Sequence, residues 1–416
     1  MSGQEYLEKG PWRGDKWWVT QLNYADEVMK QLRFPSKVQF HDVTLRDGEQ
    51  TPGVVLRMEE KLEIAKALDE AGVDRIEAGM PVVSEEDFQA IKKIANLGLN
   101  ARIFGFSRIR KEDIDACIKA DVSGVVTEGP VGYPKLKYQF SWSAEQVLEN
   151  AIKAIDYAKS HGLYTIFFTV DGTRADLVFL LDLLSRLERE TKVDGFAVAD
   201  TFGSLTPEAA RFLFSKLRER LSKPLEFHGH NDFGLATATS IAALSAGAEV
   251  VHVSVNGIGE RAGNAALEEV ATSLHLLYGQ RTGIRLERLF QLSKTVERLT
   301  GFKPAYNKPI VGDRVFTRES GIGVAGWIKY PLGSQPYDPE LVGNKPHVIV
   351  GKKSGRHSIE YKMKELGITK KISDEQLEKI LQEVKRRSIE KKAPLDDKEF
   401  IEIVDAVTTL GRIVSR

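Results

Sequence analysis

Residues 38–79 read VQFHDVTLRDGEQTPGVVLRMEEKLEIAKALDEAGVDRIEAG. The stretch opens with the β-type run VQFHDV and closes with a second such run, DRIEAG. Between the two runs, Leu62, Ala65, Leu68 and Ala71 recur at a spacing that places them on one face of a helix. The stretch therefore predicts a strand, a helix and a second strand, which is the repeating unit of an α/β fold.

The same alternation continues to about residue 279, with six more β-type runs: ARIFGF at 101–106, VSGVVT at 122–127, YTIFFTV at 164–170, DGFAVAD at 194–200, LEFHGH at 225–230 and VVHVSV at 250–255. Eight strands that alternate with helices predict a (β/α)8 TIM barrel, which we assign to residues 38–285. A doubly wound open sheet is the competing fold. Such a sheet normally has a glycine-rich phosphate turn after its first strand, whereas LRDGEQ contains one glycine.

The segments outside the predicted barrel differ from it in composition. Residues 1–37 are expected to form an N-terminal arm whose tryptophans, Trp12, Trp17 and Trp18, pack on the barrel. Residues 286–357 contain many glycines and prolines and predict a linker or small irregular subdomain.

The last segment, residues 358–416, is predicted to be helical. Ser373 and Gln376 form a capping-box pattern just before an apolar face with helical spacing.

Composition excludes several classes of protein. The 416 residues include 59 Lys+Arg and 59 Asp+Glu, so the formal net charge is zero and we expect no nucleic-acid partner. No apolar run approaches the roughly 20 residues of a membrane span, and the N-terminus does not resemble a secretory signal. The single cysteine, Cys117, excludes an internal disulfide and fits a reducing cytoplasm.

Polar residues gather where the predicted strands end, which is where TIM barrels carry their active sites. His228 and His230 are two residues apart on a strand, so their side chains share a face and could bind one cation. Asp47 supplies a carboxylate, and Asn264 could add a neutral oxygen. This mixed set suits one divalent ion (Zn, Mn, Mg or Co), although two histidines hydrogen-bonded in a polar pocket is an equally simple interpretation.

Three further residues at strand ends are candidates for substrate contacts. Arg46 offers a fixed cation for a carboxylate or a developing oxyanion, and a salt bridge across the barrel mouth is the alternative. Glu77 ends the second strand and Thr201 follows the sixth, so both are candidates for substrate contacts, although a threonine at a strand end is often only a cap.

Five motifs together resemble the metal-dependent DRE-TIM superfamily, and within it the branch of isopropylmalate, homocitrate and citramalate synthases. These motifs are HDVTLRDGEQTPGV, IEAGMP, ADTFGSLTP, HGHNDFGLATA and NGIGERAGNAALEEV. The resemblance extends over residues 38–410 and is closest to the short members that lack a regulatory domain. It implies condensation of an acyl-CoA, usually acetyl-CoA, with a 2-oxo acid on a metal, followed by thioester hydrolysis. It also implies a homodimer in which post-barrel segments reach the partner's active site.

The resemblance also implies roles for individual residues. Asp47, His228, His230 and Asn264 match the metal ligands of the family. Arg46 matches the arginine that stabilises the enolate or the substrate carbonyl, and Thr201 matches the threonine that binds the 2-oxo acid carboxylate.

The sequence departs from the family pattern at its proton-transfer groups. Val170 stands where the family has a catalytic Glu, and Gly323 stands where it has a catalytic His. We therefore predict a non-standard substrate and a relocated base. Four residues in the changed loops could replace the missing base: Glu128, Tyr133, Lys135 and Asp171.

Two other functions remain alternatives to condensation. One is a lyase or aldolase of the hydroxymethylglutaryl-CoA lyase type, but that enzyme has a cysteine after strand eight, where NGIGERAGN has none. The other is a non-catalytic paralogue that binds a metabolite, which would have no physical need to keep the metal ligands and Arg46.

Overall fold

The computed structural model describes residues 10–413, which form two compact units. The first unit runs from Thr20 to Pro304 and contains the barrel. The second unit combines the described residues up to Val19 with those from Ala305 onward. None of the helices in residues 10–413 has the length and apolar character needed to span a bilayer.

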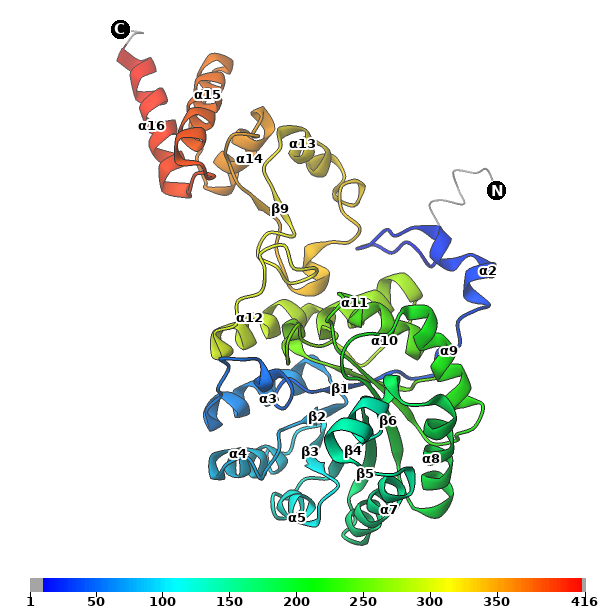
Figure 1. Ribbon diagram of the computed structural model, residues 1–416. Helices are drawn as coiled ribbons and strands as arrows, with labels where there is room; N and C mark the ends of the chain where they lie inside the picture. The colour runs from blue at the N-terminus through cyan, green and yellow to red at the C-terminus, as the bar shows by residue number, and fades with distance from the viewer. Residues whose placement is uncertain (1–9, 414–416) are drawn as a thin grey trace. The chain divides into compact units, whose positions relative to one another are not determined.

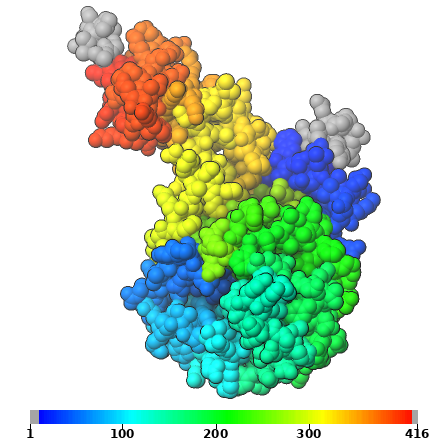
Figure 2. Space-filling view, viewed as in Figure 1, coloured from blue at the N-terminus to red at the C-terminus, as the bar shows by residue number. Residues whose placement is uncertain are grey.

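Eight parallel strands close into a barrel in chain order, which confirms the predicted fold class. Helices lie around the outside of the strands (Figure 1), and the side chains of this unit pack into a continuous body (Figure 2). The strands are β1 (Gln39–Asp42), β2 (Arg75–Glu77), β3 (Arg102–Arg108), β4 (Gly124–Pro130), β5 (Tyr164–Val170), β6 (Gly195–Asp200), β7 (Leu225–Gly229) and β8 (Val250–Val253).

One helix follows each strand after a short connection that supplies the residues of the barrel mouth. These helices are α3 (Met58–Ala71), α4 (Glu85–Ala95), α5 (Lys111–Lys119), α7 (Ala144–Ser160), α8 (Leu177–Glu190), α9 (Pro207–Arg218), α10 (Ala236–Leu244) and α11 (Leu267–Tyr278). Helix α12 (Leu289–Thr300) belongs to the same unit, as do the short helices α2 (Asp26–Met29) and α6 (Tyr133–Lys135).

The inside of the barrel has an apolar half and a polar half. Alternate residues of β3 to β6 form a buried apolar cluster: Phe104, Phe106, Val126, Ile166, Phe168, Ala197 and Ala199. The strands on the other side contribute His41, Arg75, Glu77, Glu226, His228 and His252, all buried. Because polar side chains need partners when they are buried, this second half is where a functional site is expected.

The second unit has its own small core, packed among three helices. These are α14 (Arg356–Glu365), α15 (Asp374–Lys391) and α16 (Asp397–Ile413). Ser373 caps α15 as the sequence predicted, because its Oγ accepts a hydrogen bond from the Gln376 backbone at 3.2 Å. The unit also contains α13 (Gly321–Lys329) and the parallel pair β9 (Thr317–Arg318) and β10 (His347–Val348).

The described part of the N-terminal arm up to Val19 belongs to the same unit as the post-barrel segment. The Trp18 backbone donates to the Pro336 carbonyl at 2.8 Å, and the Asp338 backbone donates to the Lys16 carbonyl at 2.7 Å. The indole of Trp12 is buried within this same unit. The arm therefore adds its backbone to the post-barrel segment, and the Trp18 ring also packs edge-on against Tyr330 of that segment.

Candidate active site

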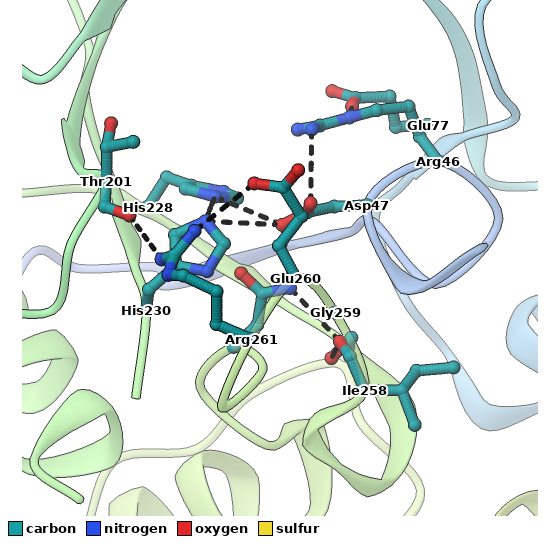
Figure 3. Close-up of polar contacts among 12 residues, drawn as sticks. Arg46, Asp47, Glu77, Thr201, His228, His230, Ile258, Gly259, Glu260 and Arg261 are labelled. Carbon is teal, nitrogen blue, oxygen red and sulfur yellow. Dashed lines mark hydrogen bonds and ion pairs between the residues drawn. The ribbon is translucent and has the colours of Figure 1, made fainter. Parts of the chain in front are cut away.

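Asp47, His228 and His230 meet at the mouth of the barrel. His228 lies on β7, His230 follows that strand, and Asp47 lies in the turn after β1. The two Nε2 atoms are 3.2 Å apart, and each lies 3.4 or 3.5 Å from Oδ2 of Asp47. Figure 3 shows the Asp47 carboxylate between the two imidazoles and Arg46. All three side chains are buried, and the structure brings them together in one cluster.

The arrangement of these three donors fits a divalent ion. Metal–ligand bonds of about 2.0–2.2 Å place the ligands of a four- or six-coordinate ion about 3.0–3.5 Å apart, and the three donor atoms are separated by 3.2 to 3.5 Å. The two facing imidazole nitrogens share a hydrogen bond when one of them carries its proton, and in the other tautomer both present lone pairs that one cation can accept. Buried His and Asp groups with this geometry are suitable metal ligands.

The protonation states are also those that a metal requires. Burial lowers the pKa of His228 to about 3, and burial also lowers the pKa of His230. Burial opposes ionisation of Asp47, but Arg46 and the two histidines together hold the pKa of its carboxyl well below its usual range. Two neutral imidazoles beside one carboxylate can all donate lone pairs to a cation at neutral pH.

Asn264 lies directly behind this cluster. Its Nδ2 donates to Oδ2 of Asp47 at 2.7 Å and to the Ile258 carbonyl at 3.1 Å. Its Oδ1 is buried and has no hydrogen-bond partner among the described residues. An unpartnered buried amide oxygen at this place is a suitable additional oxygen donor.

Arg46 is held over the cluster by two carboxylates and a ring. Its Nε donates to Glu77, its Nη1 lies 3.6 Å from Oδ1 of Asp47, and its guanidinium carbon lies 4.1 Å above the Phe106 ring. Although burial opposes its charge, Glu77 and Asp47 raise the pKa of Arg46. Nη2 is buried and has no partner among the described residues, so Arg46 keeps one oriented donor for an anionic group.

Glu77 contacts Arg46 but does not itself line the cavity. Its carboxylate is fully buried and is shared between Arg46 and Nε2 of His41, the latter at 3.1 Å. Arg46 lowers the pKa of Glu77 to about 2 against the effect of burial. In this arrangement Glu77 orients the guanidinium, and any influence on a substrate passes through Arg46.

A cavity of about 720 Å³ opens over these groups. Arg46, Asp47, His228, His230 and Thr201 line one part of it. Thr201 follows β6, and its Oγ1 accepts a hydrogen bond from the Asp171 backbone at 2.8 Å. The cavity is large enough for two small substrates, and it has cationic, anionic and apolar walls.

A second group of buried ligand-type side chains lies among the strands: His41, Glu226 and His252. Glu226 binds Nη1 of Arg75 at 2.7 Å and Nε2 of His252 at 2.8 Å, and the His41 and His252 rings stack at 4.3 Å. None of the three lines the cavity. Because Arg75 already neutralises Glu226, we interpret this group as structural.

The four candidates for the replacement base differ in whether they line the cavity. Val170 ends β5 and lines the cavity, together with Glu128 from β4 and Lys135 from α6. Asp171 and Tyr133 do not line it: Asp171 is fully buried and binds Arg174 through both carboxylate oxygens, and Tyr133 is 56% exposed.

Several cavity residues were not singled out from the sequence. Phe106 and Arg108 from β3 line the wall beside Glu128. Arg108 is the last residue of its strand, so the rule that strand ends carry function would have found it. Arg261, which follows β8, does not line the cavity but donates to the carbonyl of Thr201, which does, at 2.5 Å, and it binds Asp232 at 2.8 Å. Nothing in its sequence spacing predicts that contact.

Family models match nearly the whole described chain. The HMGL-like model matches residues 37–296, and the model described as homocitrate synthase post-HMGL domain-like matches residues 310–392. The chain belongs to the HMGL-like family. This confirms the resemblance drawn from the five motifs.

Curated relatives of this HMGL-like protein are synthases. Homocitrate synthase AksA of Methanothermobacter thermautotrophicus is 43% identical over 91% of this chain and 95% of its own. (R)-citramalate synthase CimA of Methanocaldococcus jannaschii is 46% identical over 91% of this chain and 76% of its own. The 2-isopropylmalate synthase of the same organism is 42% identical over 94% of this chain and 75% of its own.

Solved structures support the barrel fold. The HMG-CoA lyase of Bacillus subtilis superposes with a TM-score of 0.59 at 20% identity, covering 66% of this chain and 96% of that one. The carboxyl transferase domain of Rhizobium etli pyruvate carboxylase superposes with a TM-score of 0.52 at 18% identity, covering 75% of this chain and 56% of that one. At these identities the likeness concerns the fold alone.

Proposed function

We propose that this HMGL-like protein is a metal-dependent condensing enzyme that joins an acyl-CoA, acetyl-CoA above all, to a 2-oxo acid and releases a 2-hydroxy dicarboxylic acid. The observation that carries the proposal is the convergence of Asp47, His228 and His230 beside Arg46 in one cavity. The names of the curated relatives, which are homocitrate, citramalate and isopropylmalate synthases, support the same reaction class.

Asp47, His228, His230 and Asn264 would hold one divalent ion, either Zn²⁺, Mn²⁺, Mg²⁺ or Co²⁺. When bound, such an ion polarises the keto carbonyl of the 2-oxo acid as a Lewis acid. The carboxylate and imidazole donors do not select one of these metals. The metal content of the purified protein would identify it.

The protein's own residues then orient and stabilise the reactants. Arg46, fixed by Glu77, directs its unpartnered Nη2 at the oxyanion that forms when the keto carbon is attacked. Thr201 would bind the carboxylate of the 2-oxo acid from the opposite side. Glu77 would act on the substrate by positioning Arg46.

The test is a screen of acetyl-CoA and other acyl-CoAs against a panel of 2-oxo acids, with mass spectrometry of the products. The reverse reaction is followed in parallel on the corresponding hydroxy adducts. Condensation that disappears with a chelator and returns with added metal is the expected result. Cleavage without condensation would support the lyase alternative, and binding without either reaction would support the metabolite-binding paralogue.

We also propose a cytoplasmic homodimer. The mouth of the cavity carries exposed apolar side chains, among them Val55 at 78% and Val83 at 67% exposure. A second copy that covers this rim would remove apolar surface from water and keep water out of the reaction.

A further inference from the structure

Glu128 lies on the inward face of β4 next to the place that Val170 occupies on β5. Val126, two residues earlier on β4, belongs to the apolar cluster inside the barrel, and successive odd or even positions of a strand share a face. Glu128 pairs in register with Phe168, and Pro130 pairs with Val170. Glu128 and Val170 therefore face the same cavity from adjacent strands, and both line it.

Glu128 is the one uncommitted carboxylate of this cavity among the residues that the structure describes. The other acidic residues on the cavity wall are each paired: Asp47 with the histidines and Arg46, Glu49 and Asp87 with Lys61, and Glu260 with Arg261. The carboxylate of Glu128 makes no hydrogen bond or direct ion pair within residues 10–413. Glu128 is half-buried, and carboxylates that are largely removed from water are normally paired, so a free one in an active-site cavity calls for an explanation.

The surroundings of Glu128 suit proton transfer. Burial raises the pKa of its carboxyl, while the charges of Arg46, Lys135 and Arg108 act in the opposite direction. A carboxylate with a raised pKa is a stronger base than an ordinary one, and the nearby cations favour its ionised form. Phe106 and Phe168 line the same cavity and give it an apolar wall beside Glu128.

We propose that Glu128 is the catalytic base of the condensation, in place of the carboxylate that the family carries at the position of Val170. The proposal rests on the proposed function. One Glu128 oxygen takes a proton from the methyl carbon next to the thioester carbonyl. The C–H bond breaks, an O–H bond forms on Glu128, and the electron pair moves onto the thioester oxygen to give an enolate.

The addition that follows returns the proton. The enolate carbon forms a C–C bond to the keto carbon of the 2-oxo acid, and the electron pair of that carbonyl moves to its oxygen. Arg46 stabilises the resulting alkoxide, which then takes the proton from Glu128. The step needs no other co-reactant, and Glu128 ends as the carboxylate with which it began.

The other candidate bases fit less well. Asp171 is held by Arg174 at 2.7 and 2.8 Å and is fully buried away from the cavity wall. Tyr133 does not line the cavity. Lys135 lines it, but an ammonium group donates hydrogen bonds and has no lone pair with which to accept a proton.

The experiment follows two signals in Glu128→Gln: product formation, and deuterium uptake from D2O into the methyl group of acetyl-CoA. The second substrate is the 2-oxo acid that the wild-type protein uses best. We expect both signals to fall about 10²- to 10⁴-fold. Metal content and the calorimetric affinity for the 2-oxo acid should stay unchanged. Glu149→Gln, the same change at an exposed position of α7, should keep wild-type rates.

A second variant tests whether the carboxylate itself matters. Glu128→Gln combined with Val170→Glu moves the carboxylate to the neighbouring strand. The double variant should exchange methyl deuterium at least tenfold faster than Glu128→Gln alone. Wild-type exchange and condensation in Glu128→Gln would overturn the role of Glu128 and leave the proposed function standing. A wild-type protein that neither exchanges nor condenses with any pair would overturn the proposed function, and the base assignment with it.

Discussion

Arg46 shows how a single residue links the inside of the barrel to the cavity. Its guanidinium bridges Glu77 below and Asp47 beside it, and it lies over Phe106. Removing one partner of a buried ion pair typically costs about 3–5 kcal/mol, because the other charge is left uncompensated. The position of Arg46 is therefore fixed before any substrate arrives, which is what stabilisation of an oxyanion requires.

The first prediction concerns the metal. His228→Ala removes one of three donors that lie within 3.5 Å of one another, so the protein should lose its divalent ion and its activity. Elemental analysis of the purified variant measures the loss. His161→Ala, at an exposed position outside the cavity, should retain the ion. A wild-type protein that binds Mn²⁺ or Zn²⁺ elsewhere, with no density between Asp47, His228 and His230 in a soaked crystal, would contradict the assignment.

The second prediction concerns the altered family positions. We expect the wild-type protein to be a poor synthase for 2-oxoglutarate, 2-oxoisovalerate and pyruvate with acetyl-CoA, because the wall at Val170 is apolar and the proposed base lies on the neighbouring strand. Val170→Glu with Gly323→His should raise these rates. A side chain at Gly323 is sterically possible, since an added Cβ would meet its nearest atoms at 3.8 Å.

Val170→Gln with Gly323→His serves as the control, because it has nearly the same shape as the Glu variant but no base. Steady-state kinetics on the three acids compares the variants. A wild-type rate of about 1–10³ s⁻¹ on any of these pairs, which is ordinary for enzymes, would show that the residues already present suffice for a standard substrate.

At the scale of the elements, the alternation of short β-type runs and helical windows was sufficient to predict the eight-stranded barrel. The predicted fourth strand, residues 122–127, was misplaced at its end, because β4 continues to Pro130. Gly129 and Pro130 indicate a turn in a sequence read locally, whereas the ladder to β5 holds both residues in the strand. The sequence therefore left Glu128 in a loop, although its side chain lies on the inner face of the barrel.

In the candidate site too, the sequence predicted some features and not others. The shared face of His228 and His230 follows from a spacing of two, and Asp47 follows from the position of its turn. A salt bridge of Arg46 was one of two interpretations of the sequence, but its partner Glu77 was not predictable, because Glu77 lies on the neighbouring strand β2. Spacing along the chain gives the direction of a side chain but not its partner on another strand.

The third prediction tests a close approach between two loops. Gly72 ends α3 with φ +87°, and an added Cβ would lie 2.2 Å from the Gly283 carbonyl. Gly98 has a similar φ of +71° with no atom within 4 Å of an added Cβ. Each change to Ala should cost about 1–2 kcal/mol for the backbone conformation, and Gly72→Ala about 1–3 kcal/mol more for the overlap.

Urea unfolding of the two variants, followed by the signal of the barrel unit, measures the difference between their free energies of unfolding. Because the backbone conformation is shared, Gly98→Ala isolates its cost from that of the steric overlap. Equal free energies of unfolding for the two variants would mean that the loop of Gly283 moves aside without cost.

At the scale of the whole molecule, the division of the barrel interior into an apolar and a polar half explains where chemistry is possible. The apolar half, from β3 to β6, supplies packing, and β4 carries Glu128, which has no direct partner among the described residues, on the cavity wall. The polar half supplies the metal-type donors and Arg46. The cavity lies between the two halves, so Glu128 faces Arg46 and the metal-type donors across it. This arrangement suits a reaction that forms an enolate and then stabilises it.

The fourth prediction is that the protein is a homodimer whose interface includes the rim of the cavity. A stable interface buries about 1,200–2,000 Å² in total, and Val55 and Val83 expose apolar surface at this rim without a described partner that covers them. Light scattering at micromolar concentration should give twice the chain mass of 46.4 kDa. Val83→Lys should shift the mass towards the monomer, because it would bury an unpaired charge in the interface.

Val178→Lys, at an equally exposed position of α8 outside the cavity, should leave the dimer intact. A wild-type monomer at these concentrations would refute the dimer, and a dimer that tolerates Val83→Lys would place the interface elsewhere on the surface.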